Sequence, residues 1–243
     1  MKRVEQLAEG VTLYLGDCRE IAPTLDRHDI LLSDPPYGQR LKNGGKRTSR
    51  VVQPNGSKRI VESKCYAPIV GDNKPFDPTP WLDMAPEIIL WGAHKFADRL
   101  PPGGWLVWDK VPNGKVRLQG DGEAAWINRD QPLRMFRLLW DGVCVGSAAR
   151  HEVTAGQARF HPTQKPEALM AWCLGFVEGL SVLDPYMGTG STGVAAVRAG
   201  RGFTGIEIQP AFFEIALRRI EAALRAPDMF IARPESPVQE GLF

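Results

Sequence analysis

The residues best suited to chemistry in the first part of the chain are Asp34-Pro35-Pro36-Tyr37, which directly follow an apolar run typical of a strand. A carboxylate placed there stands at the carboxyl edge of a parallel sheet, where doubly wound folds bind ligands. The two prolines stiffen the turn and carry no N–H group, so its carbonyl groups stay free to accept hydrogen bonds. Together with the flat ring of Tyr37, these acceptors suit a planar base that presents an NH2 edge. The alternative is a rigid turn at a strand exit, because Asp-Pro-Pro is good turn chemistry by itself.

A second candidate site runs from Asp184 to Thr192, where an acid ends a strand, a glycine-rich turn follows and a helix begins. Glycines in this turn let the backbone approach a nucleotide-like ligand, and the helix N-terminus favours a carboxylate or phosphate. Glu207 ends the next strand, where such folds place a carboxylate for ribose hydroxyl groups. By itself the turn also fits a dinucleotide-binding dehydrogenase, and Glu207 also fits an acid at the start of a helix near Pro210.

The elements that would hold these segments alternate between strands and helices. Apolar, β-branched runs at 11–15 and 29–32 flank a helix-compatible segment at 18–25, which predicts a parallel βαβ unit. In a helix that begins at Pro210, Phe213, Leu217, Ile220 and Leu224 recur at helical spacing. The whole pattern predicts a doubly wound α/β domain. Further strands are expected at 87–91, 105–108, 137–140, 181–183 and 203–206, and further helices at 93–100, 166–177 and 191–199.

Length and composition are those of an ordinary globular domain. The chain has 243 residues, of which 43% are apolar and 24% charged, and it contains no apolar stretch long enough to cross a membrane. Its first residues lack the apolar run of a secretory signal. The four cysteines are far apart and form no C-x-x-C pair. We therefore expect reduced thiols in a cytoplasmic protein, with neither a disulfide framework nor a metal site.

Positive charge is concentrated in one segment, although the formal net charge is only +2. Residues 39–64 contain eight basic residues and one acid, together with Asn-Gly and Pro-Asn-Gly turn signals. One interpretation is a solvated flexible loop. The other is a mobile loop that binds phosphates, because affinity for a polyanion comes largely from counterion release. The candidate phosphate-binding residues are Arg40, Lys42, Lys46, Arg47, Arg50, Lys58 and Arg59.

Taken in order, the motifs resemble those of a known family. Asp34-Pro35-Pro36-Tyr37 comes first, His161-Pro162-Thr163-Gln164-Lys165-Pro166 follows, and the glycine turn from Asp184 to Thr192 comes last. This order resembles the amino-methylating DNA methyltransferases of the permuted class, in which the catalytic motif precedes the glycine turn, and especially their phage and prophage members. The resemblance covers nearly the whole chain and implies a mostly parallel, seven-stranded Rossmann-like sheet. Trp91-Gly92-Ala93-His94, Pro102-Gly103-Gly104-Trp105 and Trp108-Asp109-Lys110 are also similar to segments of that family.

The resemblance implies S-adenosylmethionine as cofactor and site-specific methylation of N6 of adenine in double-stranded DNA, after the base has left the duplex. It makes Asp34, Pro35, Pro36 and Tyr37 the catalytic turn. It also implies that Glu207 holds the ribose of the cofactor, that Lys165 lies near its carboxylate and that Asp17 reaches its adenine. The last assignment requires the strand at 11–15 to lie beside the strand at 203–206. The other cofactor-binding residues implied are His161, Thr163, Asp184, Tyr186, Gly188, Gly190 and Thr192.

The expected organisation is one methyltransferase domain at residues 1–226 with a basic insertion at 39–80 and a flexible tail at 227–243. Residues 141–160 are the candidate target-recognition region. This region is short for that task, which makes the basic insertion a rival for reading the DNA sequence. Such an enzyme is expected to be bacterial or phage-encoded and typical of restriction-modification.

Three alternatives to adenine methylation stay open. N4 of cytosine can use the same turn, although Asp34 rather than a serine before the prolines favours adenine. Enzymes that methylate RNA or a protein glutamine use related turns, but they normally carry the glycine turn first. A catalytically silent DNA-binding module on the same fold is the third, and the intact Asp34, Tyr37 and Gly188 argue against it. The recognition sequence and the oligomeric state do not follow from the sequence.

The last five residues, Gln239 to Phe243, resemble the short Gln-x-x-Leu-Phe peptides that dock on bacterial sliding clamps. A chance match is the alternative. In that case Leu242 and Phe243 fold back onto the domain or have no role.

Overall fold

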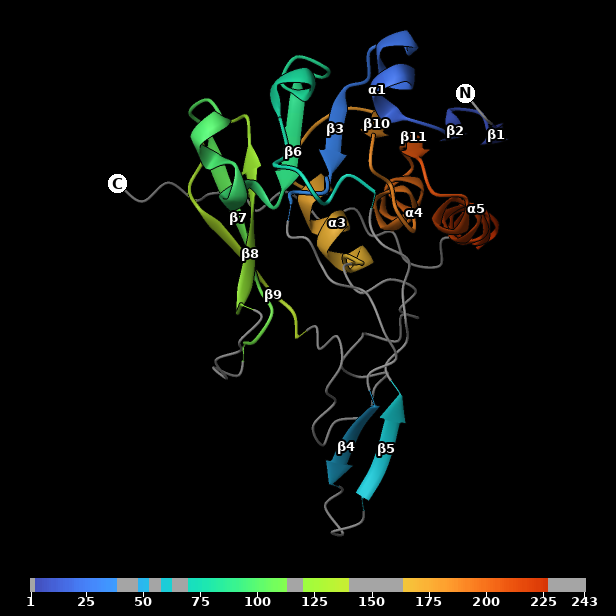
Figure 1. Ribbon diagram of the computed structural model, residues 1–243. Coiled ribbons are helices and arrows are strands. Elements are labelled where there is room, and N and C mark those ends of the chain that lie inside the picture. The colour runs from blue at the N-terminus through green and yellow to red at the C-terminus, as the bar shows by residue number, and fades with distance from the viewer. Residues whose placement is uncertain are drawn as a thin grey trace.

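The computed structural model describes residues 3–38, 70–112, 120–139 and 164–226, together with the backbone of two strands at 48–52 and 58–62. Within these residues one large sheet has the strand order β1-β2-β11-β10-β3-β6-β8-β7-β9. The five strands from β2 to β6 in this order are all parallel to one another. The sheet is therefore the mostly parallel α/β sheet that the sequence predicts (Figure 1).

The central strands are short and buried. β2 (Val11–Leu15), β3 (Ile30–Ser33), β6 (Glu87–Trp91), β10 (Ser181–Asp184) and β11 (Gly202–Glu207) form the parallel part of the sheet. β2 pairs with β11 from Val11–Phe203 to Leu15–Glu207. The expected neighbourhood of these two strands, which are distant in sequence, is thus confirmed.

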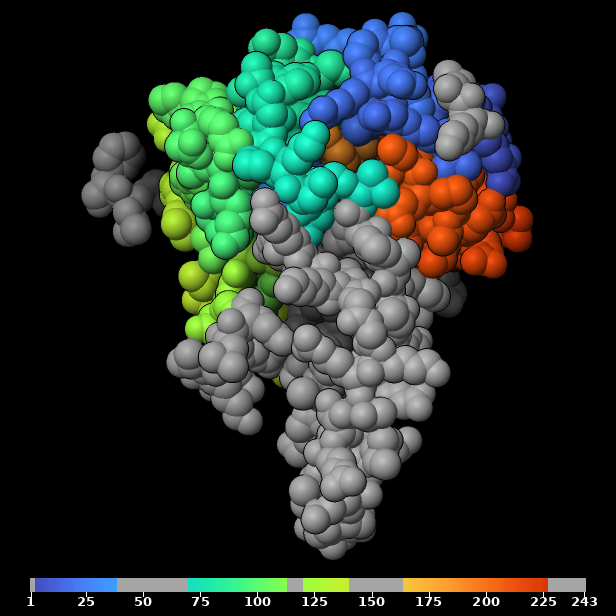
Figure 2. Space-filling model, viewed as in Figure 1, coloured from blue at the N-terminus to red at the C-terminus, as the bar shows by residue number. Residues whose placement is uncertain are grey.

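Side chains alternate along the strands and divide the core between the two faces. Ile30 and Leu32 join the cluster beneath α3 (Glu167–Leu174), α4 (Ser191–Arg198) and α5 (Pro210–Arg225), whereas Leu31 joins the cluster on the other face. That other face is covered by α1 (Cys18–Ile21) and by 3-10 turns η1 (Ala22–Thr24) and η2 (Thr79–Trp81). Figure 2 shows the segment that begins at residue 70, in teal, between the N-terminal part in blue and α5 in orange.

The sheet extends beyond the seven strands expected. β7 (Gly104–Asp109) and β8 (Gly122–Ile127) pair antiparallel, and β8 lies between β6 and β7. With these two the central sheet has its seven strands, and β1 (Arg3–Ala8) and β9 (Arg134–Arg137) add one at each edge. β1 is only partly buried and rich in polar residues, as an edge strand can be, and its residues do not alternate clearly between apolar and polar.

Several predicted elements differ from those observed. The helix expected at 93–100 is two 3-10 turns, η3 (Ala93–Lys95) and η4 (Ala97–Arg99), because Phe96 between them has φ −142° and cannot continue a helix. The strand expected at 137–140 is β9, three residues earlier. In α5 the predicted apolar stripe holds for Phe213 and Ile220, which are buried, but Leu224 is 37% exposed at the helix end.

Part of the expected basic loop forms a hairpin. β4 (Thr48–Val52) and β5 (Lys58–Glu62) pair antiparallel as a separate two-stranded sheet. In Figure 1 this hairpin lies apart from the large sheet. No helix in the described part of the chain is long and apolar enough to cross a membrane.

Candidate active site

The Asp-Pro-Pro-Tyr turn leaves the fully buried strand β3 at the carboxyl edge of the sheet. It ends at Gly38, which has φ +80° and whose amide donates a hydrogen bond of 3.1 Å to Oδ1 of Asp72. A Cβ atom on Gly38 would lie 2.7 Å from the carbonyl oxygen of Lys74. The segment that contains Asp72 and Lys74 therefore packs tightly against the turn, and only glycine fits at the point of contact.

The carboxylate of Asp34 is held on one side only. Its Oδ2 lies 2.5 Å from the ammonium nitrogen of Lys165, whose side chain is 5% exposed. Its Oδ1 is buried and has no hydrogen-bond partner among the described residues. A buried acceptor without a partner is costly, so it indicates a place where a ligand supplies the donor.

Two further charges continue this arrangement. Lys165 also lies 2.9 Å from Oε2 of Glu123, and Glu123 accepts a hydrogen bond from Lys110. Burial alone would lower the pKa of Lys165, but the carboxylates of Asp34 and Glu123 outweigh it and raise this pKa. Burial also acts to raise the pKa of Glu123, yet the two lysines hold it at about 2. Glu123 is thus a carboxylate and Lys165 an ammonium group at any ordinary pH.

The ring of Tyr37 is fixed by its neighbours. A Cβ atom on Gly92, at φ +71°, would lie 2.3 Å from Cε1 of this ring, so the ring rests directly on the backbone of the residue after β6. His94 meets the ring edge-on, with centroids 6.4 Å apart. Burial raises the pKa of the Tyr37 phenol, which stays neutral. A fixed neutral ring beside a carboxylate is suited to stacking on a base.

Asp184, at the end of β10, joins the glycine turn to the Asp-Pro-Pro-Tyr turn. Its Oδ1 accepts hydrogen bonds of 2.6 Å from the hydroxyl group of Ser33 and 3.1 Å from the amide of Tyr186. Burial raises its pKa to about 6, although the bonds from Ser33, Thr192 and Tyr186 act to lower it. The two motifs, far apart in sequence, are thereby fixed relative to each other.

The turn after Asp184 has a backbone that only glycine adopts without strain. Gly188 and Gly190 have φ +52° and +82°. A Cβ atom on Gly193 would lie 2.5 Å from Cδ1 of Ile220, so this glycine lets α4 pack closely on α5. Arg219 of α5 donates hydrogen bonds to the carbonyl and hydroxyl oxygens of Thr189 and thereby holds the turn against α5.

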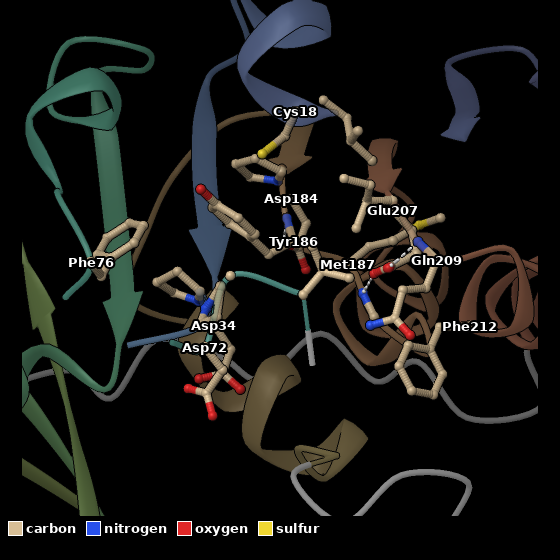
Figure 3. A pocket seen from close by; sticks show the side chains of 18 of the residues that line it. Cys18, Asp34, Asp72, Phe76, Asp184, Tyr186, Met187, Glu207, Gln209 and Phe212 are labelled. Atoms are coloured by element: carbon tan, nitrogen blue, oxygen red, sulfur yellow. Dashed lines mark hydrogen bonds between the residues drawn. The ribbon is translucent and has the colours of Figure 1, made fainter. Parts of the chain in front are cut away.

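Glu207, at the end of β11, faces the glycine turn. Its Oε2 accepts a hydrogen bond of 3.0 Å from the amide of Gly188, and its Oε1 accepts one of 2.7 Å from the amide of Gln209. Burial raises the pKa of Glu207 to about 7, against the effect of these two amides. Figure 3 shows Glu207 and Gln209 at one side of the pocket and the carboxyl groups of Asp34 and Asp72 together at the other.

One cavity of about 590 Å³ connects these groups, a size that suits a small-molecule ligand. Its wall is aromatic where Tyr186 packs edge-on against Phe76 and Trp81. The cavity is thus lined by a carboxylate at each end and by apolar surface between them. The sequence-predicted residues in its lining are Asp17, Asp34, Pro35, Pro36, Tyr37, Lys165, Asp184, Tyr186, Gly188, Thr192 and Glu207.

Comparison with known proteins decides the family. A sequence model of the N6/N4 methyltransferases, described as DNA methylase, matches residues 85–218. The chain belongs to this family. It is 47% identical over 231 residues to the Type II methyltransferase M2.DpnII of Streptococcus pneumoniae, which covers 80% of this chain and 82% of the relative. Over 65 residues, 26% of this chain and 22% of the relative, it is 45% identical to the DNA adenine methyltransferase YhdJ of Escherichia coli K12.

Solved structures support the fold of this DNA methylase. The M1.HpyAVI–SAM complex matches it with a TM-score of 0.50 and 19% sequence identity, over 86% of this chain and 98% of the other. At this identity the likeness concerns the fold alone. The chain is therefore an amino-methylating DNA methyltransferase with the Rossmann-like sheet of such enzymes.

Some predicted residues of this DNA methylase have contacts that the sequence did not predict. The ammonium group of Lys165, which is predicted to lie near the cofactor's carboxylate, pairs with Asp34 and Glu123. Gly190 does not line the cavity; a Cβ atom there would meet Ala216 of α5. His161, Thr163, Arg40, Lys42, Lys46 and Arg47 lie outside the described residues, as do the side chains of Arg50, Lys58 and Arg59 in β4 and β5.

Sequence reasoning missed other residues of the site. Glu123 lies in β8, a strand that was not predicted. The only local signal for it is the strand period of two, which places Glu123 and Ala125 on the same face of Gly-Glu-Ala-Ala-Trp-Ile. Asp72 and Phe76 lie in a segment that packs against the Asp-Pro-Pro-Tyr turn, and no local sequence pattern in that segment indicates this contact. Gln209 and Phe212 come soon after Glu207 in the sequence, and their place in the lining follows from the start of α5.

Proposed function

We propose that this DNA methylase transfers a methyl group from S-adenosylmethionine to N6 of adenine in double-stranded DNA. The observation that carries the proposal is the buried Oδ1 of Asp34, an acceptor without a partner among the described residues, beside the fixed ring of Tyr37. An exocyclic amine supplies the donor that this atom lacks. The aspartate before the two prolines, and the likeness to an enzyme named as an adenine methyltransferase, favour adenine over cytosine.

The other end of the cavity fits the cofactor. Glu207 presents a buried carboxylate that the ribose hydroxyl groups can reach, and the backbone of Gly188 leaves room for a close ligand. Gly188, Asp184 and Thr192 would hold the methionine part, and Asp17 would face the adenine. When bound, S-adenosylmethionine supplies an electrophilic methyl group: the sulfur–methyl bond breaks as the methyl–nitrogen bond forms, and the sulfonium leaves as a neutral thioether.

The protein's own groups make the target amine reactive. The lone pair of this nitrogen is delocalised into the ring, which makes it a poor nucleophile. Hydrogen bonds from the NH2 group to Oδ1 of Asp34 and to the carbonyl oxygen of Pro35 would draw the nitrogen toward tetrahedral geometry. Tyr37 would stack on the base after it leaves the duplex. After the transfer the nitrogen gives up one proton to solvent. The protein forms no covalent bond to the base in this reaction, so positioning and electrostatics account for the rate.

The experiment is to incubate the full chain with duplex DNA and S-adenosylmethionine, digest the DNA to nucleosides and identify the product by mass spectrometry. N6-methyldeoxyadenosine is the expected product. N4-methyldeoxycytidine would assign the other amine, and no methylated nucleoside would overturn the proposal. DNA synthesised with N6-methyladenine throughout is the matched control, and it should accept no further methyl groups.

Target recognition is proposed on sequence alone. The basic insertion at 39–80 would contact phosphates, and residues 141–160 would contribute to base reading within a single domain at 1–226. Positive charge at 39–64 supports the first assignment, because phosphate contacts dominate affinity for DNA. Residues 141–160 lie outside the described residues.

A partner for the tail is a separate proposal, and it also rests on sequence alone. The pair Leu242-Phe243 would enter an apolar pocket of a bacterial sliding clamp as a short anchor. Truncation after Pro237 tests this. Docking predicts lost retention on a purified clamp with unchanged melting temperature, whereas fold-back predicts a lower melting temperature. If the full chain shows no clamp binding, the proposal fails.

A further inference from the structure

Four charges of alternating sign form a chain behind the catalytic turn. Lys110 binds Glu123, Glu123 lies 2.9 Å from Lys165, and Lys165 lies 2.5 Å from Asp34. Each comes from a different part of the fold: Lys110 directly follows β7, Glu123 lies in β8, Lys165 lies in the segment before α3, and Asp34 directly follows β3. The chain of charges ends at Asp34, whose Oδ1 is buried without a hydrogen-bond partner among the described residues.

Lys165 is the link between Glu123 and Asp34, and it is fixed at both ends. Its backbone carbonyl accepts a hydrogen bond of 2.8 Å from the hydroxyl group of Ser191, at the start of α4. Its ammonium group is nearly excluded from solvent, so its position depends on the two carboxylates that compensate its charge. With Glu123 present, the ammonium lies between two acceptors. Without it, the whole charge would fall on Asp34.

The side of Asp34 that Lys165 occupies determines the side left for a ligand. Because Lys165 is on Oδ2, the carboxylate plane is fixed and Oδ1 is the acceptor that remains. Because Lys165 shares its ammonium group with Glu123, more negative charge stays on Asp34 than an unshared ammonium group would leave. Both effects favour a strong hydrogen bond from an incoming amine.

We propose that Glu123 is a positioning residue of the methyltransferase: through Lys165 it sets the orientation and the charge of the Asp34 carboxylate for the target amine. The inference rests on the proposed function, in which Asp34 accepts from that amine. Glu123 touches neither cofactor nor substrate in this account.

The electrostatics of Asp34 give the inference a readout separate from stability. Burial raises the pKa of Asp34, Lys165 opposes this, and Glu123 raises it further. Among the described residues, the other charged or titratable groups that face this region are Lys110, Tyr37, Asp184, Asp72 and His94. Loss of the Glu123 charge should therefore lower the pKa of Asp34, and a purely structural role for Glu123 would leave it unchanged.

The experiment compares Glu123→Gln, Glu123→Asp and a control, Glu87→Gln, in the full chain. Glu87 is a similarly shielded glutamate, 20% exposed against 16% for Glu123, and it pairs with Arg129 at the start of β6. Two quantities are measured: the pKa of Asp34 in the unliganded protein by carboxyl ¹³C NMR, and the single-turnover rate of methyl transfer against pH. Melting temperature and the Kd for S-adenosylmethionine are recorded for each variant.

Glu123→Gln should lower the pKa of Asp34, move the acid limb of the rate profile to lower pH, and slow transfer by about 10²-fold at unchanged Kd for the cofactor. Glu123→Asp should recover part of the rate, and Glu87→Gln should behave as the unaltered protein. If Glu123→Gln leaves the Asp34 pKa where it was, or slows transfer no more than the control, the inference is wrong. Should Glu123→Gln fail to fold, the same two measurements on Glu123→Asp decide. An unaltered protein that methylates no DNA would refute the proposed function, while the NMR titration would still decide the coupling.

Discussion

The hydroxyl group of Ser33 donates a hydrogen bond of 2.6 Å to Oδ1 of Asp184, so the residue before Asp34 is joined to the acid of the glycine turn. Both residues are buried, at 0% and 2% exposure. The contact links two parallel strands, β3 and β10, at their carboxyl ends. It fixes the distance between the two halves of the cavity, one for the target base and one for the cofactor in our proposal.

Ser33→Ala removes this bond and should lower the free energy of unfolding by about 1–3 kcal/mol, because a buried acceptor loses a partner. Urea denaturation measures the effect. The control is Thr24→Ala, which removes a bond of 2.7 Å to the carbonyl of Ile21 that spans only three residues at a partly exposed site. If Ser33→Ala lowers the free energy of unfolding no more than Thr24→Ala does, the contact between Ser33 and Asp184 does not stabilise the fold as we expect.

Gly92→Ala tests the support of the Tyr37 ring. A Cβ atom at Gly92 would lie 2.3 Å from Cε1 of the ring, so the ring must move and methyl transfer should fall sharply. Gly200→Ala is a matched control, since Gly200 has φ +67° against +71° for Gly92 and nothing within 4 Å of the added atom. Both variants bear the left-handed backbone cost of about 1–2 kcal/mol. Equal single-turnover rates in the two would show that Tyr37 needs no fixed position.

Cofactor affinity should depend on pH through Glu207. Burial raises its pKa to about 7, and the ionised form is the better acceptor for ribose hydroxyl groups. Affinity for S-adenosylmethionine should therefore rise with pH up to the pKa of Glu207 and level off above it, with a slope below it of at most about tenfold per pH unit. Calorimetry from pH 6.5 to 8.5 measures this, above the pKa of about 6 for Asp184.

Glu207→Gln should weaken binding and remove this pH dependence, whereas Glu214→Gln, on an exposed pair with Arg3, should keep it.

The stability of the unliganded protein should fall with rising pH, opposite to the affinity for the cofactor. Because the folded-state pKa is raised from 4.5 to about 7, the folded state binds more protons in this window, and this contribution to stability falls as pH rises through it. If the affinity of the unaltered protein for S-adenosylmethionine does not change with pH, Glu207 does not contribute to cofactor binding.

Neutralising Lys46, Arg47 and Arg50 should weaken DNA binding and flatten its salt dependence. The slope of log K against log salt should lose up to about 0.9 for each phosphate contact removed. A triple variant of Arg27, Arg218 and Arg225, exposed residues elsewhere on the domain, is the charge-matched control. An unchanged slope in the first variant would leave the basic segment as solvated surface.

The sequence predicted the site residues better than their contacts. Strand ends are readable, because an apolar run closed by an acid marks the carboxyl edge of a sheet, and Asp34, Asp184 and Glu207 all meet at one cavity. The pairing of β2 with β11 also followed, from the order of the motifs. Gly188, Gly190 and Gly193 also have the spacing of a dinucleotide-binding turn, so the turn alone could not decide between cofactors.

What could not be predicted depends on packing between distant segments. The partner of Lys165 was unknown because Glu123 lies in β8, whose alanines carry little strand signal. The segment at 93–100 has helical composition, but Gly92 enters it in the left-handed region and Phe96 interrupts it, so that Tyr37 can rest on the Gly92 backbone. In both places the tertiary contact overrides the local preference.

The most direct test is the single-turnover rate of Asp34→Ala, with the Kd for S-adenosylmethionine measured on the same preparation. Asp34→Ala should slow methyl transfer by about 10²–10³-fold, equivalent to about 3–4 kcal/mol, because its contact with the amine strengthens in the transition state. The Kd for the cofactor should stay close to that of the unaltered protein, since Asp34 and Glu207 lie at opposite sides of the pocket (Figure 3). A variant that transfers methyl groups at a near-normal rate would contradict the assignment of Asp34 as the acceptor for the target amine.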